Sequence, residues 1–374
     1  MDDSETMQLA LDLASRVEGR TSPRPPVGAV VVRDGEIVGQ GATAPPFGPH
    51  AEIEALTAAG PATRGATLYV TLEPCCVTIH TPPCTDAIIA AGIQRLVVGT
   101  LDPNPLVAGR GLQQLRAMDI AVHCLDSEAA ALLVRPFATF ITQQRPYVTA
   151  KWAMTLDGKL ATHTGDARWI SGPQSRALVH DLRDRVDAIL IGARTASIDN
   201  PQLTARLSSD ISVQMQRTRR SGPLRVILAT HGQLPDHLAL LQPALAAGTW
   251  IIVGETCSPT YIQALKRRGV RVCPVAVDDH HHIDIAAALE LLAQQGYMHV
   301  LMEGGSHILG SAFECRCVDH VMAFIAPKII GGSSAPSPVG GSGKGTMSEA
   351  WELCNSSIQQ FGDDVLIRGD VKYI

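Results

Sequence analysis

The sequence predicts an α/β fold divided into two domains, and three observations support that prediction. Its 374 residues are more than one ordinary core organises, so the length favours two domains. Hydrophobic residues make up 45% and charged residues 18% of the chain, which is the composition of a globular protein. Short apolar runs alternate with helical patterns through both halves, as expected of sheets covered by helices.

The first half begins with a predicted amphipathic helix and continues with strands and helices in alternation. The opening, MDDSETMQLALDLASRVEGR, lacks the basic flank and the continuous apolar core of a signal peptide. Two of the later helices stop at a glycine, which is a typical helix terminator. The predicted strands are 27–32, 67–72 and 95–100, and the predicted helices after the first are 51–60, 84–92 and 111–118.

A polar stretch, TQQRP, separates the last helical pattern of the first half from a new strand that begins YVTAKWAM. We therefore place the domain boundary near residue 145, which gives domains 1–145 and 146–374. The second half repeats the alternation of strands and helices, and residues 330–350, rich in Gly, Ser and Pro, are predicted to form a loop. Its predicted strands are 147–154, 188–193, 225–230, 250–254 and 299–305, and its predicted helices are 173–186, 259–268 and 285–295.

Charge, apolar runs and cysteine content argue against several classes of protein. The net charge is -5, from 31 basic and 36 acidic residues, and no basic block is present, which argues against a nucleic-acid partner. No run of eighteen apolar residues occurs, so we expect no membrane span. The nine cysteines are odd in number and scattered, which favours a reduced, cytoplasmic chain over a disulfide scaffold.

The stretch TLEPCCVTIHTPPC, residues 71–84, contains three of the cysteines. Upstream, GPHAEIEAL begins a predicted helix, which places His50 and Glu52 in its first turn. Cys75 follows a predicted strand and Cys84 opens a helix, and helix N-termini stabilise thiolates. Two helix starts and a strand end are able to converge on one point. The sequence therefore predicts one zinc ion per chain, held by His50, Cys75 and Cys84 with an open fourth position.

Glu52 completes the pattern of the zinc nucleobase deaminases, in which His-x-Glu is followed by Pro-Cys and a second Cys. Because this Glu is near the metal but does not bind it, Glu52 is the predicted catalytic proton shuttle. Cys76 exceeds the three ligands and is interpreted as a packed neighbour, since a fourth ligand would close the open position. The alternative interpretation is a structural zinc site or buried cysteines without a metal. The motifs His-Ala-Glu, Glu-Pro-Cys and Pro-Pro-Cys, in this order, argue against that alternative.

Further motifs make the whole chain resemble the bifunctional deaminase–reductases of riboflavin biosynthesis. They are PHAE, the eight-residue separation of Cys75 from Cys84 with its TPPC ending, DPNPLVAGRG (102–111) and LDGK (156–159). The resemblance implies a cytidine-deaminase-like α/β/α sandwich followed by a dihydrofolate-reductase-like α/β domain that uses NADPH. It further implies that diaminohydroxyphosphoribosylaminopyrimidine is deaminated and that the ribosyl group is then reduced to ribityl. We also expect the protein to be a homo-oligomer.

The same resemblance assigns residues of the second domain to cofactor and substrate binding. It also places Thr155 and Asp157 at the reductase site. A strand ending in Gly-Gly before a helix exposes N–H groups to a pyrophosphate, and guanidinium groups bind phosphate oxygens in pairs. For NADPH the resemblance implies Ala153, Trp169, Thr195, Asp199, Gly305 and Ser306. For the phosphoribosyl substrate it implies Lys151, Arg183, Leu203, Arg206 and Glu303.

The first domain departs from the family pattern at four substrate-binding positions. Arg24 replaces an Asn, Thr43 a His, Val77 a second His and His80 a basic residue, whereas the metal set and Glu52 are kept. In the second domain Ala167 stands where a Ser is expected. Either the pocket is adapted to a related pyrimidine, as in a flavin- or pteridine-like antibiotic pathway, or the zinc domain is vestigial beside an active reductase. The retention of Glu52, which zinc binding does not need, favours chemistry.

Two interpretations from other classes remain at this point. One is a nucleic-acid deaminase of the tRNA-adenosine type, against which the acidic balance, the long zinc loop and the second domain argue. The other is a non-catalytic protein that uses zinc for folding and its second domain as a nucleotide sensor.

Overall fold

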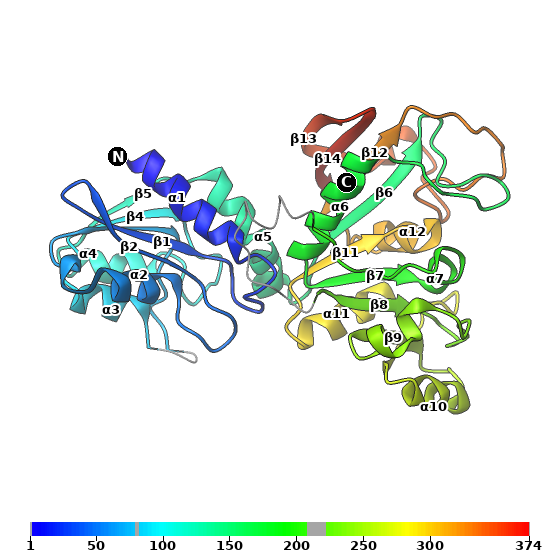
Figure 1. The fold of residues 1–374 in the computed structure, drawn as a ribbon, viewed down its shortest axis with the longest axis horizontal. Helices are drawn as coiled ribbons and strands as arrows, with labels where there is room; N and C mark the ends of the chain where they lie inside the picture. Colours follow the sequence, from blue (N-terminus) through cyan, green and yellow to red (C-terminus); the bar gives the residue numbers. More distant parts are fainter. Residues whose placement is uncertain (1, 79–81, 208–221, 374) are drawn as a thin grey trace. The chain divides into compact units, whose positions relative to one another are not determined.

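The computed structural model describes residues 2–78, 82–207 and 222–373. The chain divides into two compact units, the first containing residues up to Arg145 and the second beginning at Pro146. Each unit is built on one sheet (Figure 1). None of the described helices is both long and apolar enough to cross a membrane.

The first unit has a five-stranded sheet in the order β2-β1-β3-β4-β5. The sheet is mixed, because β1 pairs antiparallel with β2 and β3, whereas β3, β4 and β5 are parallel. Its strands are β1 (Gly28–Arg33), β2 (Glu36–Ala42), β3 (Thr67–Leu72), β4 (Arg95–Thr100) and β5 (Ala121–Cys124). Its helices are α1 (Asp3–Arg16), α2 (Ala51–Ala59), the 3-10 turn η1 (Gly60–Thr63), α3 (Cys84–Ala90), α4 (Arg110–Arg116) and α5 (Glu128–Gln143).

Helices cover both faces of this sheet, with α1 and α5 on one side and α2, α3 and α4 on the other (Figure 1). Side chains of β1 alternate between the two cores: Val30 packs with α1, and Val31 packs with α2. The close approach of α1 requires Gly28, since a Cβ there would lie 1.9 Å from the Ala10 carbonyl oxygen. The predicted α/β/α sandwich is therefore confirmed for this part of the chain.

The second unit has a nine-stranded sheet in the order β10-β9-β8-β7-β11-β6-β12-β14-β13. The strands from β10 to β12 are parallel, and β14 and β13 continue the sheet antiparallel. They are β6 (Tyr147–Thr155), β7 (Ala188–Gly192), β8 (Leu224–Leu228), β9 (Thr249–Gly254), β10 (Arg271–Val275), β11 (His299–Glu303), β12 (His320–Ala326), β13 (Glu352–Phe361) and β14 (Asp364–Lys372). The helices are α6 (Pro173–Arg185), α7 (Ala193–Asp199), η2 (Ala239–Leu241), α9 (Pro243–Ala246), α10 (Pro259–Arg267), α11 (Ile285–Gln294), α12 (Ser306–Glu314) and η3 (Met347–Glu349).

This sheet is also covered on both faces. In β7, Leu190 faces the core built with α11 and α12, and Ile191 faces the core that contains α7, α9 and α10. Helix α6 packs over Phe324 of β12 through Val179. The α/β assignment of the second half is confirmed, and residues 330–350 contain only the short turn η3 among helices and strands.

Candidate functional site

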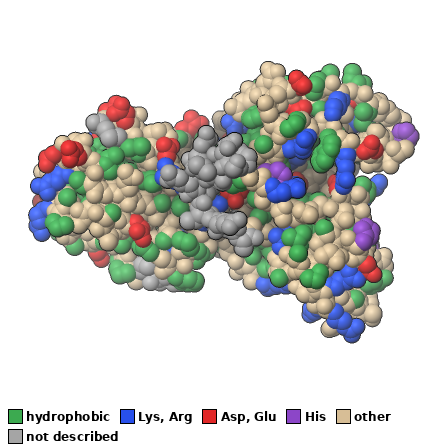
Figure 2. Space-filling model, viewed as in Figure 1, with side chains coloured by type: hydrophobic (Ala, Val, Ile, Leu, Met, Phe, Trp, Pro, Cys, Tyr) green, Lys and Arg blue, Asp and Glu red, His purple; other side chains and the backbone are tan. Residues whose placement is uncertain are grey.

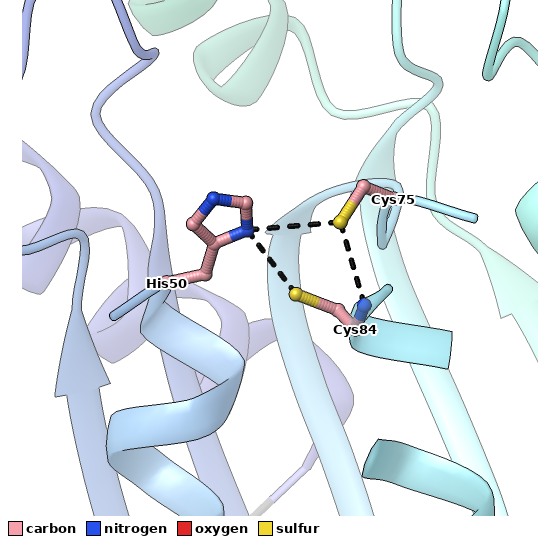
Figure 3. Close-up of side chains that lie close together, drawn as sticks. All are labelled: His50, Cys75 and Cys84. Atoms are coloured by element: carbon pink, nitrogen blue, oxygen red, sulfur yellow. Dashed lines mark hydrogen bonds between the residues drawn. The ribbon is translucent and has the colours of Figure 1, made fainter. Parts of the chain in front are cut away.

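The three predicted zinc ligands of the first unit lie together (Figure 3). His50 is the N-cap of α2, Cys75 follows β3, and Cys84 is the first residue of α3. The His50 Nδ1 atom is 3.2 Å from the Cys84 Sγ and 3.7 Å from the Cys75 Sγ. All three ligand atoms lie within 4.8 Å of one another.

Local structure explains this convergence. The apolar strand β3 is buried in the sheet and ends at Leu72, and Glu73 and Pro74 then lead directly to Cys75. The first turn of α3 returns to the same place, where the Cys84 N–H donates to the Cys75 Sγ at 3.4 Å and the Thr85 N–H donates to the Cys75 carbonyl at 3.2 Å. One imidazole and two sulfurs form the donor set that zinc prefers. The half-buried Cys76 is outside this ligand group in the described chain.

Hydrogen bonding within the group favours a thiolate. The Cys84 side chain lowers the pKa of the Cys75 thiol to about 4, and the same interaction raises the pKa of Cys84. The hydrogen bond with Cys75 raises the pKa of His50. Because the thiolate is the form that binds a metal, the cluster is prepared for a cation.

Glu52 lies in the first turn of α2 with 4% of its surface exposed. Its side chain lines a cavity of about 430 Å³ together with His50 and Cys75. Burial raises the pKa of the Glu52 carboxyl, and the neighbouring His50 opposes that shift. A carboxyl group with a raised pKa beside an open cavity suits proton transfer near neutral pH.

Glu73 holds the segment around Asp102 that lines part of the cavity, a feature that the sequence analysis missed. Its buried carboxylate accepts backbone N–H groups from Asp102 at 3.2 Å, Gly109 at 2.9 Å and Leu112 at 3.3 Å. These bonds bring Asp102 and Asn104 into the cavity lining. Burial raises the pKa of Asp102 to about 6. The DPNP motif, which contains Asp102 and Asn104, could have indicated this part of the site. Its hydrogen-bond partner Glu73 is distant in sequence, so the pairing was not visible in the motif.

Three of the four unusual pocket residues line this cavity: Arg24, Thr43 and Val77. The Thr43 hydroxyl accepts the Val27 N–H at 3.1 Å and is thus engaged with the backbone. Val77 contributes to a largely apolar lining. The fourth residue, His80, lies outside the described residues. The lining's apolar members include Pro23, Pro25, Val27, Pro46, Phe47, Leu72, Val107, Phe137, Phe140 and Ile141.

In the second unit, Arg183 and Glu303 form a bidentate ion pair. The Arg183 Nε is 2.6 Å from Glu303 Oε1, and its Nη2 is 2.7 Å from Oε2. The pair joins α6 to the end of β11, and Lys151 on the adjacent β6 lies near enough to act on Glu303 electrostatically. Burial raises the pKa of Glu303, but Arg183 and Lys151 outweigh that effect, so its pKa is lowered. Three residues predicted to meet substrate are therefore neighbours.

The predicted phosphate-binding turn lies next to α7. Gly304 and Gly305 have φ values of 60° and 81° and lead into α12, which begins at Ser306. A Cβ on Gly305 would lie 2.9 Å from the Thr195 Oγ1, so the turn packs closely on Thr195. Asp199 is the last residue of α7, and its carbonyl accepts the Arg168 Nη2 at 2.9 Å.

The other predicted residues of the second unit are more dispersed. Trp169 is 66% exposed, and the Arg176 guanidinium lies 4.8 Å from its ring centroid. Ala153 on β6 packs against the Phe324 core, and Leu203, 2% exposed, lies in the core beside α7. Leu203 therefore has a packing role, and its contact with substrate stays a prediction. Arg206 is exposed.

Thr155 and Asp157, at the end of β6, hold one end of the 330–350 loop. The Thr155 hydroxyl donates to the Asp157 Oδ1 at 2.6 Å, and the Asp157 Oδ2 accepts the Gly331 N–H at 2.7 Å. Asp157 thus anchors the loop to the end of β6.

Each of the two units matches a known protein family. Residues 1–100 match the cytidine and deoxycytidylate deaminase zinc-binding region, and residues 146–367 match the RibD C-terminal domain. The riboflavin biosynthesis protein RibD of Aquifex aeolicus is 40% identical over 366 residues, 98% of this chain and 97% of that protein. The chain belongs to the RibD family. It is a bifunctional deaminase and reductase of riboflavin biosynthesis.

Solved RibD structures agree with this assignment. Acinetobacter baumannii RibD superposes with a TM-score of 0.84 at 30% identity, covering 99% of both chains. The TM-score is 0.80, at 34% identity, for a Thermotoga maritima diaminohydroxyphosphoribosylaminopyrimidine deaminase/5-amino-6-(5-phosphoribosylamino)uracil reductase. The match covers 98% of this chain and 97% of that one. Membership of the RibD family argues against the two other interpretations, a nucleic-acid deaminase and a non-catalytic nucleotide sensor. On the face drawn in Figure 2, Lys and Arg side chains lie in separate groups among other residues.

Proposed function

We propose that the first unit performs zinc-dependent hydrolytic deamination with Glu52 as the proton-transferring residue. The observation that carries this proposal is the convergence of His50, Cys75 and Cys84 beside a cavity that Glu52 also lines. A zinc ion bound there supplies the Lewis acidity that activates water. Glu52 would move one proton of the attacking water to the ring nitrogen, and would then move the second proton from the new hydroxyl group on the ring carbon to the amine, which leaves as ammonia. His50, Cys75 and Cys84 would hold the ion beside the largely apolar walls of the cavity.

For the second unit we propose NADPH-dependent reduction of a phosphoribosyl group. NADPH supplies the reducing equivalent, and the N–H groups at the Gly305–Ser306 turn would bind its phosphates. Thr195 packs against that turn, and Asp199, Trp169 and Ala153 are the further cofactor candidates. Lys151 and the Arg183–Glu303 pair would face the sugar, with Arg206 on the phosphate, because a guanidinium binds phosphate oxygens well.

The proposed substrate is the one in the name of the Thermotoga relative, diaminohydroxyphosphoribosylaminopyrimidine. A related aminopyrimidine is the second candidate, because Thr43 and Arg24 hydrogen-bond to the protein backbone in this cavity. A vestigial zinc domain is disfavoured by the buried Glu52, which has no structural ligand role.

Mass spectrometry of products tests the proposal. The purified protein, loaded with zinc, is given the diaminopyrimidine with and without NADPH. Exchange of an amine for oxygen should raise the product mass by about one unit, and reduction should add about two more when NADPH is present. No mass change with this substrate, but turnover of another aminopyrimidine, would establish the second candidate instead. A product that gains only the reductive increment would show a vestigial zinc domain.

Replacement of Arg206 with Ala should raise the KM for the phosphorylated substrate of the reductase by roughly ten- to a hundredfold. The reason is the loss of a charged hydrogen bond, worth about 1.5–3 kcal/mol. The exposed Arg267 of α10 provides a matched control, and Arg267→Ala should leave KM unchanged. Steady-state kinetics checks both variants. An unchanged KM in Arg206→Ala would remove Arg206 from the substrate site.

A further inference from the structure

Arg24, one of the unusual pocket residues, binds the loop that precedes the zinc ligand His50. Its Nη1 donates to the Gly48 carbonyl at 2.7 Å, and its Nη2 donates to the carbonyls of Ala44 at 2.7 Å and Pro45 at 2.5 Å. One side chain thus joins the turn before β1 to the segment between β2 and α2. We refer to residues 43–49 as loop 43–49.

Arg24 is itself held firmly in place. Its backbone N–H donates to the Thr21 carbonyl at 2.9 Å, and its carbonyl accepts the Thr21 hydroxyl at 2.8 Å. Thr21 is 1% exposed, so this anchor belongs to the protein interior. The Arg24 Nε is buried and has no hydrogen-bond partner within the described chain, which shows that protein encloses the group. A fixed base allows Arg24 to restrain what its guanidinium binds.

Loop 43–49 forms part of the cavity wall through Thr43, Pro46 and Phe47. Phe47 is 88% exposed, so packing contributes little to its position. Bonds from Ala44 N–H to Pro49 and from Gly48 N–H to Pro45, each 3.0 Å, shape the loop internally but do not attach it to the rest of the unit. At its start the loop is joined to the rest of the unit by the Thr43 N–H, which donates to the Val27 carbonyl at 2.9 Å, and Arg24 adds three bonds at Ala44, Pro45 and Gly48. A planar guanidinium presents several donors in a fixed geometry, which suits three carbonyls around one turn.

We propose that Arg24 is a positioning residue of the deaminase cavity, which fixes loop 43–49 so that Pro46 and Phe47 form a preorganised wall against the substrate. A preorganised wall lowers the ordering cost of binding and so lowers KM. The metal ligands and Glu52 are held by α2, α3 and the end of β3, so the chemical step does not depend on Arg24. The kinetic part rests on the proposed deaminase function, whereas the restraint of the loop does not.

The test compares Arg24→Met with Arg24→Lys in the full-length, zinc-loaded protein. Met keeps the length of the side chain without donors, and we expect amide exchange in peptides spanning 43–50 to accelerate about tenfold. The deaminase KM should rise about tenfold with kcat changed by less than about twofold. Lys has donors at a single point, so it should restore part of both effects. The zinc content of the same samples reports the folding of the first unit, because the zinc ligands come from three of its elements.

Arg33→Met is the matched control, because Arg33 of β1 is 44% exposed and its ion pair with Asp34 is on the surface. It should change neither exchange nor KM. Unchanged exchange at 43–50 in Arg24→Met would overturn the proposal, and a raised KM with that result would mean that Arg24 contacts substrate instead. A fall in kcat at constant KM, with the zinc content unchanged, would mean that Arg24 acts on the chemical step and would also overturn the proposal. If the wild-type protein deaminates nothing, the proposed function fails, and exchange alone decides the role of Arg24.

Discussion

Replacement of Glu52 with Gln is expected to lower the kcat of deamination by roughly 10²–10⁴-fold, the usual contribution of a general acid–base residue. The amide keeps the shape of the side chain but is unable to accept and return a proton. Since Glu52 is outside the group of metal ligands, the bound zinc should remain at one ion per chain. Ammonia release and metal analysis on the same sample measure both quantities.

Glu54→Gln supplies the matched control for this prediction. Glu54 lies in the same turn of α2 but is exposed, so its replacement should leave deamination unchanged. Stability should not fall in Glu52→Gln, because burial disfavours the charged form of Glu52 and a neutral amide avoids that penalty. Retained deamination with zinc present would exclude Glu52 as the proton shuttle. Loss of zinc would instead show that Glu52 supports the metal site.

Replacement of Arg183 with Met is expected to destabilise the second unit by about 3–5 kcal/mol and to abolish reduction. The Arg183 and Glu303 side chains are only 14% and 11% exposed. Removing the guanidinium leaves a buried carboxylate with Lys151 as its remaining neighbouring cation. Because that lysine compensates in part, we expect the lower end of the range. Denaturant unfolding of the variant and NADPH oxidation measure the two effects.

The surface pair Arg268–Asp236 gives the comparison within the same unit. Its side chains are 31% and 88% exposed, and Arg268→Met should cost at most about 1 kcal/mol, as exposed ion pairs do. A double variant, Arg183→Met with Glu303→Leu, should recover part of the lost stability because no charge is then left buried. A stability loss in Arg183→Met as small as that in Arg268→Met would contradict the buried-pair interpretation.

The sequence analysis found most of the elements near the zinc site but missed the ends of both sheets. The strand predicted at 67–72 coincides with β3, and the strand at 95–100 with β4. By contrast, β13 and β14 were not predicted. Most side chains of β13 are exposed, so this strand lacks the apolar alternation that identifies a half-buried strand. Its position depends on pairing with β14, which is a tertiary contact.

The sequence by itself determined the family, and it predicted three residues that the structure brings together, His50, Cys75 and Cys84. His50 and Cys84 lie at helix starts and Cys75 at a strand end, and the order and spacing of the deaminase motifs were enough to group them before the fold was known. Only the tertiary structure decided that Arg183 pairs with Glu303, that Leu203 is buried, that Glu73 holds the loop at Asp102, and that Arg24 holds loop 43–49. In each ion pair or hydrogen bond of this kind the partners come from different elements. A polar side chain's role then depends on which acceptor the fold brings within about 3 Å, and residue type and spacing do not specify that.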